Sequence, residues 1–289
     1  MQIVSYKSVI YTLLVILIWS FGWILTKVGL DHMPPFTFAA LRFVIAAVLM
    51  LLIASIKYKC NHFSRKEWCI VILVGLTQTT LMFTFINIGM QNVSVGKASI
   101  LIYSMPIWSA VLAYLFLQEP LKAKDILILC FGIIGVYFVF VPGISIESDI
   151  FGLFLLLLSA ISWAVSNILV KKYFAKHNKF VLTTWQMLFG SVGLVALSFW
   201  FENPLGLSLN YIEWGILLYT SIFASVVAFT LWFSILPSLN VMSSTMPSLL
   251  IPFFVIMFDS IFLEQSVTVS VAMGLILIAL SCILTALRK

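Results

Sequence analysis

The chain has 289 residues, of which 63% are hydrophobic and only 9% are charged, and its formal net charge is +6. A water-soluble domain carries about 25% charged residues, so this composition excludes a soluble globular domain and predicts an integral membrane protein. The excess of Lys and Arg does not indicate nucleic-acid binding, which needs a basic stripe on one folded surface, because here the basic residues are scattered between apolar segments.

Ten apolar segments follow one another along the chain. A helix needs about 20 apolar residues to cross the hydrocarbon core of a bilayer, so ten helices leave only short loops. The first five predicted spans are Ser8 to Leu30, Phe36 to Ile56, Trp68 to Gly89, Ala98 to Leu117 and Lys124 to Val141. The other five are Phe151 to Val170, Phe180 to Phe201, Tyr211 to Leu236, Val241 to Leu263 and Val267 to Leu287. The first segment lacks a small-residue cleavage site, so we expect it to be retained as a span and not removed as a signal peptide.

The second half of the chain repeats the first. Residues 8–140 align with residues 152–287, and at offsets of 144 or 145 the alignment pairs Trp19 with Trp163, Lys27 with Lys171, Arg42 with Gln186 and Glu119 with Glu264. Each copy holds five spans, and because five is odd, the second copy must thread the membrane upside down relative to the first. We therefore predict an all-α membrane fold of two inverted five-helix repeats, residues 1–146 and 147–289.

The distribution of Lys and Arg predicts the orientation, because basic loop residues are retained on the cytoplasmic side. With the N-terminus inside, the outer side holds only Lys27 and Lys97, and Arg42 lies within the second span. The inner side then holds thirteen, which are Lys7, Lys57, Lys59, Arg65, Lys66, Lys122, Lys124, Lys171, Lys172, Lys176, Lys179, Arg288 and Lys289. This asymmetry predicts ten spans in the cytoplasmic membrane, with both termini in the cytoplasm.

Several short motifs resemble one transporter family. They are Trp19-Ser20, the stretch PFTFAALR from Pro35 to Arg42, the stretch SMPIWSAVLAYLFLQEPL from Ser104 to Leu121, and GIIGV from Gly132 to Val136, with a second set at Trp163, Pro252, Glu264 and Gly274. Their order resembles the EamA family of the drug/metabolite transporter superfamily, over nearly the whole chain. The resemblance implies a ten-helix carrier that works by alternating access and moves small metabolites, often amino acids and often outward. One departure stands out: Pro106 and Glu119 are 13 positions apart, whereas Pro252 and Glu264 are 12 apart. Spans four and nine should therefore differ by a bulge or an earlier ending.

Depth within the spans predicts the substrate site, because duplicated transporters bind near the bilayer midplane between their repeats. Trp19 and Trp163 lie at mid-span, and Trp23 and Asn167 follow one turn later on the same helical faces. An unpaired amide in lipid would cost several kcal/mol, so Gln78 must face protein or water, and Met82 lies one turn beyond it. The predicted substrate-binding residues are Trp19, Trp23, Gln78, Met82, Tyr103, Trp163, Asn167 and Tyr219, with packing as the alternative role for each.

Charges and prolines within the spans form a second group of candidates. Lys27, Arg42 and Asp259 are either a coupling network, with Asp259 carrying a proton, or structural charges that pair or snorkel to the membrane surface. Pro106, Pro247 and Pro252 each remove a backbone hydrogen bond, and so predict kinks that either move during gating or shape the cavity statically. Glu119 and Glu264 are expected to end spans four and nine.

Together with what the resemblance implies, these observations predict a secondary transporter for a small metabolite, an amino acid or a related solute, exported through a central cavity. Alternatives on the same architecture are a lipid carrier or a nucleotide-sugar transporter, although diphosphate binding needs more buried Lys or Arg than Arg42 and Lys27 provide. An intramembrane enzyme is disfavoured, because neither metal-ligand spacing nor a His-Asp pair occurs in the spans. We expect no cofactor and no nucleic acid, a solute and the lipid bilayer as partners, and a monomer as sufficient.

Overall fold

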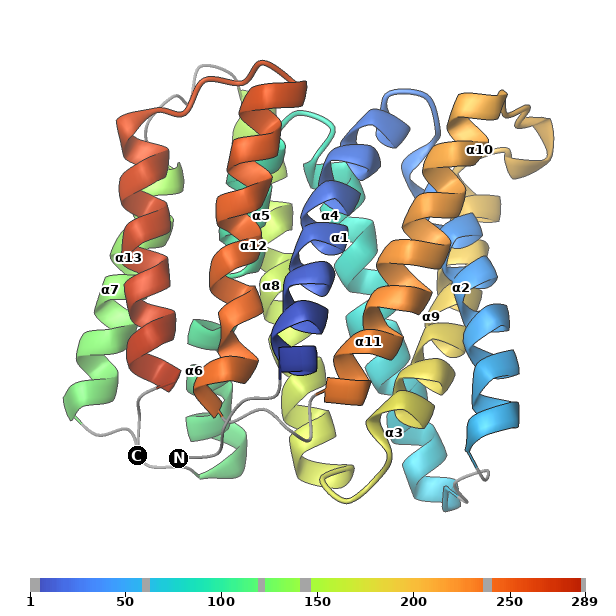
Figure 1. Cartoon of the computed structure of the whole chain (residues 1–289), viewed down its shortest axis with the longest axis horizontal. Helices are drawn as coiled ribbons and strands as arrows, with labels where there is room; N and C mark the ends of the chain where they lie inside the picture. Colours follow the sequence, from blue (N-terminus) through green and yellow to red (C-terminus); the bar gives the residue numbers. More distant parts are fainter. Residues whose placement is uncertain (1–5, 59–62, 119–122, 141–146, 236–240, 287–289) are drawn as a thin grey trace.

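The protein is described by a computed structural model that covers residues 6–58, 63–118, 123–140, 147–235 and 241–286, with some side chains in these ranges not described. Every element in the described part is a helix (Figure 1). The helices of the first half are α1 (Tyr6–Leu30), α2 (Pro35–Lys57), α3 (Arg65–Gly75), η1 (Leu76–Leu81), α4 (Met82–Gly89), α5 (Val95–Ile102), α6 (Met105–Leu117) and α7 (Ala123–Phe140). Those of the second half are α8 (Glu147–Tyr173), α9 (Lys179–Phe201), η2 (Pro204–Gly206), α10 (Tyr211–Leu218), η3 (Tyr219–Val227), α11 (Ala228–Ile235), α12 (Val241–Phe262) and α13 (Val269–Ala286).

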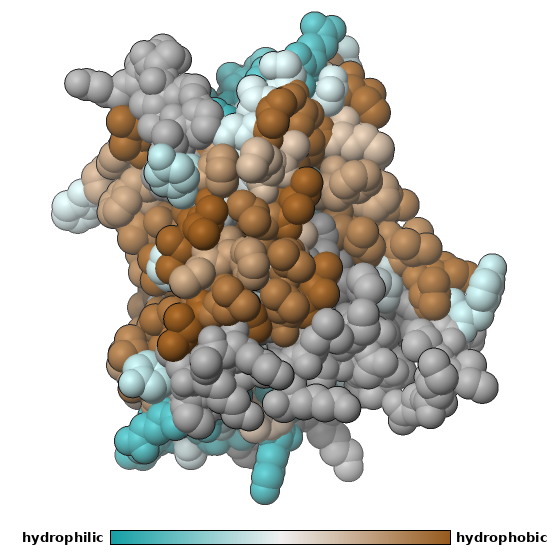
Figure 2. All heavy atoms as spheres, turned by 90° about the vertical axis from the view of Figure 1, so that its left-hand side faces the viewer, coloured by the Kyte–Doolittle hydropathy of each residue, from teal (hydrophilic) through white to brown (hydrophobic). Residues whose placement is uncertain are grey.

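Each of the ten predicted spans corresponds to helical structure. Seven helical segments in the described part are long and apolar enough to cross a membrane, and three shorter apolar ones, Ile126–Val139, Leu250–Phe262 and Val269–Ser281, fall in predicted spans five, nine and ten. Large hydrophobic side chains are exposed on most of these helices. Figure 2 shows them as a hydrophobic band between two hydrophilic ends. Because lipid tails are the solvent that such a band requires, this surface is that of an integral membrane protein.

The chain begins α1 and ends α13 on the same face of the bundle, the lower one in Figure 1, which we call the termini face. The described basic residues predicted to lie inside are found here, at the end of α2, the start of α3, and around the α8–α9 turn. Lys27 and Lys97 lie toward the opposite face, where Trp200 and Tyr211 are also 83% and 86% exposed. The cytoplasmic assignment of the termini face stays a prediction.

The two halves of the sequence interleave. The main contacts pair α2 with α9, α7 with α13, α4 with α8, α1 with α11, α6 with α8, and α1 with α12, so every one joins residues 1–146 to residues 147–289. The contacts are also reciprocal under the sequence repeat: the contact of α4 with α8 corresponds to that of α1 with α11, and the contact of α6 with α8 corresponds to that of α1 with α12.

Two features of the chain hold α9 against its neighbours α2 and α3. At one end Glu202, just after α9, accepts hydrogen bonds from the N–H groups of Phe36 and Thr37 at 2.9 and 2.7 Å. These are free donors at the start of α2, where a carboxylate is favoured by the helix dipole. Farther along, Gly75 and Gly190 bring α3 and α9 into backbone contact, because a Cβ on Gly190 would lie 2.6 Å from the Gly75 carbonyl oxygen. Helix α9 is thereby fixed against both α2 and α3.

Corresponding helices of the two halves share one irregularity and differ in another. Span three contains the π-helical turn η1 and span eight contains η3, at equivalent positions of the repeat. Span four is broken into α5 and α6 by a turn at Tyr103 and Ser104, whereas α12 runs unbroken through span nine. The predicted difference between spans four and nine is therefore present, but as a break and not as a bulge or an earlier ending. Pro106 contributes, because a proline cannot donate a hydrogen bond back to Ile102.

Candidate functional site

A cavity of about 420 Å³ lies between the two halves. Its lining comes from α1, α2, η1, α4, α5, α6, α8, α9, η3, α11 and α12, and no residue of α7 or α13 in the described part contributes. Spans five and ten therefore pack against each other outside the site, as Figure 1 shows at the left edge of the bundle.

The cavity extends toward one membrane face and is closed toward the other. Val170 and Lys179 line it where α8 ends and α9 begins, on the termini face, and both are partly exposed. Thr26 and Ile86 line it near the ends of α1 and α4 on the opposite side, and only 3% and 1% of their surfaces are exposed. A solute could therefore reach the cavity from the termini face, whereas packed side chains separate it from the other.

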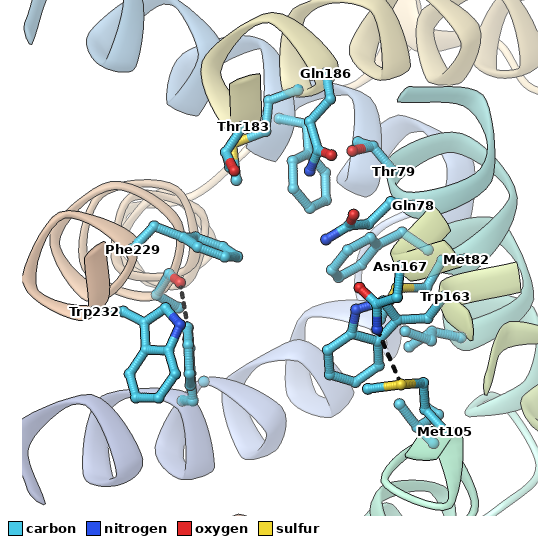
Figure 3. Close-up of a pocket in the computed structure, with 18 of the residues that line it drawn as sticks. Gln78, Thr79, Met82, Met105, Trp163, Asn167, Thr183, Gln186, Phe229 and Trp232 are labelled. Carbon is cyan, nitrogen blue, oxygen red and sulfur yellow. Dashed lines mark hydrogen bonds between the residues drawn. The ribbon is translucent and has the colours of Figure 1, made fainter. Parts of the chain in front are cut away.

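One side of the cavity is aromatic. The Trp19 indole donates to the Ala224 carbonyl oxygen at 2.8 Å, which fixes its ring, and its centroid lies 5.4 Å from that of Phe229 and 6.3 Å from that of Trp232. Across the cavity, beside Gln78 and Asn167 in Figure 3, Trp163 forms a second edge-to-face pair with Tyr103 at 5.8 Å. These rigid rings offer apolar surface at low entropic cost, and they suit a solute with an apolar or aromatic portion.

The facing side carries polar groups. Figure 3 shows Thr183 and Gln186 on α9 and Thr79 and Gln78 on η1 following one another along this wall, opposite Phe229 and Trp232. In the described part of the chain, the Gln186 amide and the Thr79 and Thr183 hydroxyls have no hydrogen-bond partner, although all three residues are buried. Buried polar groups are normally paired, so these side chains are available to water or a solute inside the cavity.

Two further amides are only partly engaged. The Gln78 carbonyl oxygen accepts a hydrogen bond from the Ser166 hydroxyl, which orients the amide and leaves its NH₂ group without a partner among the described residues. Asn167 donates to the Met105 sulfur at 3.0 Å, and a thioether is a weak acceptor. Both side chains can therefore donate to a solute without breaking a strong bond within the protein.

Arg42 projects into the cavity. Its Nε donates to the Ser225 hydroxyl at 3.2 Å, and its guanidinium lies 5.0 Å from the Phe83 ring centroid and 5.1 Å from that of Phe43. Snorkelling of Arg42 to the membrane surface is therefore not what the structure shows. No ion pair joins it to a described carboxylate.

Of the predicted network of Lys27, Arg42 and Asp259, the structure brings Lys27 and Asp259 within electrostatic reach of each other but keeps Arg42 apart. Lys27 and Asp259 lie near the opposite face, where Lys27 donates to the carbonyl oxygens of Met90 and Gln91 at 2.5 and 3.0 Å. Asp259 accepts from the Gly96 N–H at 2.8 Å and lines a separate cavity of about 260 Å³, which we call the opposite-face pocket. Arg42 belongs to the central cavity, so it cannot share a proton relay by direct contact with Asp259.

The structure places most of the predicted substrate-binding residues together, because Trp19, Trp23, Gln78, Met82, Tyr103, Trp163 and Asn167 all line the central cavity. Tyr219 is not among the lining residues: its hydroxyl donates to the Ile18 carbonyl oxygen at 3.3 Å and its ring packs on Phe21 and Phe223. Tyr219 therefore lies outside the cavity lining in this structure, and a role in binding the solute stays a prediction.

The prolines predicted to kink the helices, and the glutamates expected to end spans four and nine, do not all lie at the cavity. Pro106 lines the cavity just after the break in span four, whereas Pro252 is buried inside α12 without reaching the lining. The side chain of Pro247 and the whole of Glu119 lie outside the described part of the chain. Glu264 follows the end of α12 with a φ of 54°, a left-handed backbone that stops a helix.

Several lining residues were not expected from the sequence, namely Thr79, Met105, Thr183, Phe229 and Trp232. Phe229 and Trp232 follow η3, where the extra residue of a π-helical turn rotates the helix face, so that helical periodicity counted from the start of span eight does not find them. Gln186 could have been found, since the repeat pairs it with Arg42 and both line the cavity.

Comparison with known proteins identifies relatives of this architecture. The sequence profile described as the EamA-like transporter family matches residues 6–141 and again residues 150–287. The chain is 29% identical to the uncharacterized transporter YoaV of Bacillus subtilis (strain 168), covering 91% of each chain, and 27% identical to the uncharacterized transporter YvbV of the same organism, covering 97% of this chain and 92% of the other.

A plant relative and a solved structure extend the comparison. The chain is 28% identical to the WAT1-related protein At3g02690, chloroplastic, of Arabidopsis thaliana, over 86% of this chain and 62% of that one. A crystal structure with 16% sequence identity superimposes with a TM-score of 0.68, covering 97% of this chain and 96% of the other, which shows a shared fold.

Proposed function

Because the chain belongs to the EamA-like transporter family, we propose that it is a secondary transporter that moves one class of small metabolite, an amino acid or a related solute, through the central cavity. The relatives named above as transporters support a membrane transporter of the drug/metabolite type. The solute, the direction and the mechanism are our proposal.

The observation that carries this proposal is the composition of the cavity wall. One side presents Trp19, Phe229 and Trp232, and the other presents unpaired amides and hydroxyls such as Gln186 and Thr183. Ligand sites are mostly apolar with a few placed polar groups, and this cavity has that composition. It favours a compact solute with an apolar portion and a polar end over a wholly polar sugar.

Alternating access is the mechanism that the packing supports. The reciprocal contacts of α4 with α8 and of α1 with α11 are those expected of two repeats related by a two-fold axis. We propose that this axis lies in the membrane plane, so that the halves are inverted and a second conformation exchanges the roles of the two faces. The conformation described here would be the one open toward the termini face.

The charge distribution supports a cytoplasmic termini face in the cytoplasmic membrane, since the described Lys and Arg residues at loop ends gather there. In that orientation the cavity opens to the cytoplasm, where an exporter loads its solute. A reporter fused after Lys289 that is active only in the cytoplasm would support the orientation, and activity only of a reporter that requires export would reject it.

Counterflow in proteoliposomes tests the proposed function. Proteoliposomes that contain the purified protein are preloaded in turn with amino acids, aromatic acids, sugars, nucleotide sugars or cationic drugs, and they should accumulate one class of labelled solute. Trp163→Ala should reduce that uptake at least about tenfold by removing one aromatic ring from the cavity lining. Trp200→Ala is the matched control, because Trp200 is 83% exposed at the end of α9 and does not line the cavity.

Two outcomes would contradict the proposal. Absence of counterflow for every solute class, with lipid scrambling between leaflets instead, would favour a lipid carrier. Equal uptake by the wild type and by Trp163→Ala would remove the central cavity as the site.

A further inference from the structure

The charges that line the central cavity have one sign. Arg42 and Lys179 contribute to the wall, and no Asp or Glu in the described part of the chain does so. A solute cation would meet two positive side chains and no carboxylate, whereas an anion would be attracted along the whole path from the mouth. The electrostatics of the cavity therefore select for a negative group on the solute.

The two cations differ in what they can bind. Lys179, at the mouth, already donates from Nζ to the Phe174 carbonyl oxygen at 2.5 Å. Arg42 uses only Nε within the protein, on Ser225, and within the described residues its Nη1 and Nη2 have neither a hydrogen-bond acceptor nor a carboxylate. These two groups form one edge of the guanidinium fork, whose spacing matches the two oxygens of a carboxylate.

The guanidinium is held in place before any solute arrives. Ser225, which accepts from Nε, donates its own proton to the Thr220 carbonyl oxygen at 2.9 Å within η3, so its lone pairs are turned toward Arg42. The rings of Phe43 and Phe83 lie within 5.1 Å of the guanidinium carbon. A side chain anchored in this way loses little freedom on binding, which favours tight recognition.

From these contacts we infer that the solute is a carboxylate with an aromatic or apolar body, that Arg42 binds its carboxylate, and that Trp19, Phe229 and Trp232 contact its body. The inference rests on the proposed transport function and narrows its substrate class. Amino acids carry the required group, but so do organic acids without an amine, and the described cavity wall offers no acidic side chain to an ammonium. The carboxylate is therefore the group that is recognised.

Three probes with the same body and different charge test this inference. Phenylpropanoate, phenylpropanol and phenylpropylamine are negative, neutral and positive at pH 7. Each is titrated against the detergent-solubilised wild-type protein, and the ligand-induced rise in melting temperature reports affinity without any transport step. We expect the acid to bind at least about tenfold more tightly than the alcohol, as for a charge-assisted hydrogen-bonded pair, and the amine to bind most weakly.

Variants at one position then assign the effect to Arg42. Arg42→Gln should bring the acid to within about threefold of the alcohol while leaving alcohol binding unchanged. Arg42→Lys should retain a preference for the acid but bind it less tightly than the wild type, because an ammonium lacks the planar fork. Unchanged alcohol binding also shows that each variant is folded, and Lys97→Gln, a charge removed far from the cavity, is the control for net charge.

The outcomes separate this inference from the proposed function. Wild-type protein that binds the amine or the alcohol as tightly as the acid overturns the inference, and so does Arg42→Gln with acid binding intact. Either result leaves transport standing if counterflow of another solute class is observed. Loss of counterflow for all solutes, with acid-selective binding retained, would instead overturn the proposed function and keep the carboxylate site.

Discussion

The central cavity and the opposite-face pocket lie toward opposite ends of the bundle and differ in what lines them. The cavity is lined by aromatic rings, unpaired amides and two cations, and extends to the termini face. The opposite-face pocket is lined mainly by loop residues and contains Asp259, whose exposed fraction is 4%. The first has groups that can recognise a solute, whereas the second has a carboxylate that joins two helices. Recognition and closure are therefore separable, and substitutions should affect them differently.

Asp259 contributes a hydrogen bond that helps to keep the opposite face closed. Its Oδ2 accepts from the Gly96 N–H, near the start of α5, and so joins α12 to α5 across the two halves. A Cβ at position 96 would lie 3.1 Å from this oxygen, so a larger residue would crowd it. Its Oδ1 is buried without a hydrogen-bond partner in the described part of the chain. A bond of this kind stabilises the closed face without touching the solute.

The largest loss of stability is expected from a substitution at the close contact between α3 and α9, because α9 carries part of the polar wall of the cavity. Gly190→Leu would force a side chain into a gap where a Cβ already lies 2.3 Å from the Thr79 Cβ and 2.6 Å from a backbone oxygen. We expect a loss of roughly 3 kcal/mol or more in the stability of the α3–α9 contact, seen as loss of monodisperse protein in size-exclusion chromatography. Gly215→Leu is the control, because nothing lies within 4 Å of a Cβ there, and failure of both variants would mean that the close approach is not the cause.

The next effect should come from the carboxylate of the opposite-face pocket. Asp259→Leu removes a charge-assisted hydrogen bond worth roughly 1.5–3 kcal/mol, so the opposite face should open more often. In a cysteine-free background, labelling of Val93→Cys, at a position that lines that pocket and is only 4% exposed, by a hydrophilic maleimide should then accelerate at least about tenfold. Lys27→Met, which removes bonds to Met90 and Gln91 but keeps Asp259, should accelerate it less. Transport that falls more for one solute than for another would contradict a pure closure role.

A smaller effect is expected on the aromatic wall. Trp232→Ala should weaken binding of an aromatic solute by about 1 kcal/mol, or roughly fivefold, through lost ring contact. The preference for acid over alcohol should not change, because Trp232 is not the charged group. Trp214→Ala, on α10 outside the cavity, is the matched control and should bind like the wild type. A changed preference for acid over alcohol in Trp232→Ala would contradict this prediction, because it would show that Trp232 also contributes to recognition of the charge.

The smallest effect should be seen at Tyr219, which lies in neither pocket. Tyr219→Phe removes one hydrogen bond of 3.3 Å to Ile18 and keeps the ring contacts with Phe21 and Phe223. We expect a loss of at most about 1 kcal/mol in stability and unchanged solute affinity in the melting assay. Affinity that falls several-fold would return Tyr219 to the site, in a conformation other than this one.

Depth along an apolar segment predicted seven of the cavity residues. A residue in the middle of a span lies at the depth of the cavity however the helices pack against one another. Rotation about the helix axis was harder to predict. Tyr219 begins η3, and Phe229 and Trp232 follow it, so the π-helical turn changed which face of span eight meets the cavity. The break between α5 and α6 was visible only as a difference in spacing, since Pro106 indicates an interruption without saying whether the helix bends or ends.

The partners of Arg42 could not be predicted either. Its depth allowed both snorkelling and pairing, and the choice depends on Ser225, 183 positions away along the chain, being turned toward it by η3. Long-range contacts of this kind require the packing of the whole bundle. The sequence repeat paired Arg42 with Gln186, and both line the cavity, so the repeat carried information on the site that depth alone did not.

The interleaved contacts also bear on how such a molecule can move. Each helix next to the cavity has its main neighbour in the other half, so swinging residues 1–146 as a rigid body against residues 147–289 would break α2–α9, α7–α13 and α1–α12 together. Under the alternating access proposed above, we therefore expect the moving parts to be mixed sets, one built around α8 with α4 and α6, the other around α1 with α11 and α12. The proposed moving sets thus differ from the two halves of the sequence, and we expect a hinge between those sets and not between residues 1–146 and residues 147–289.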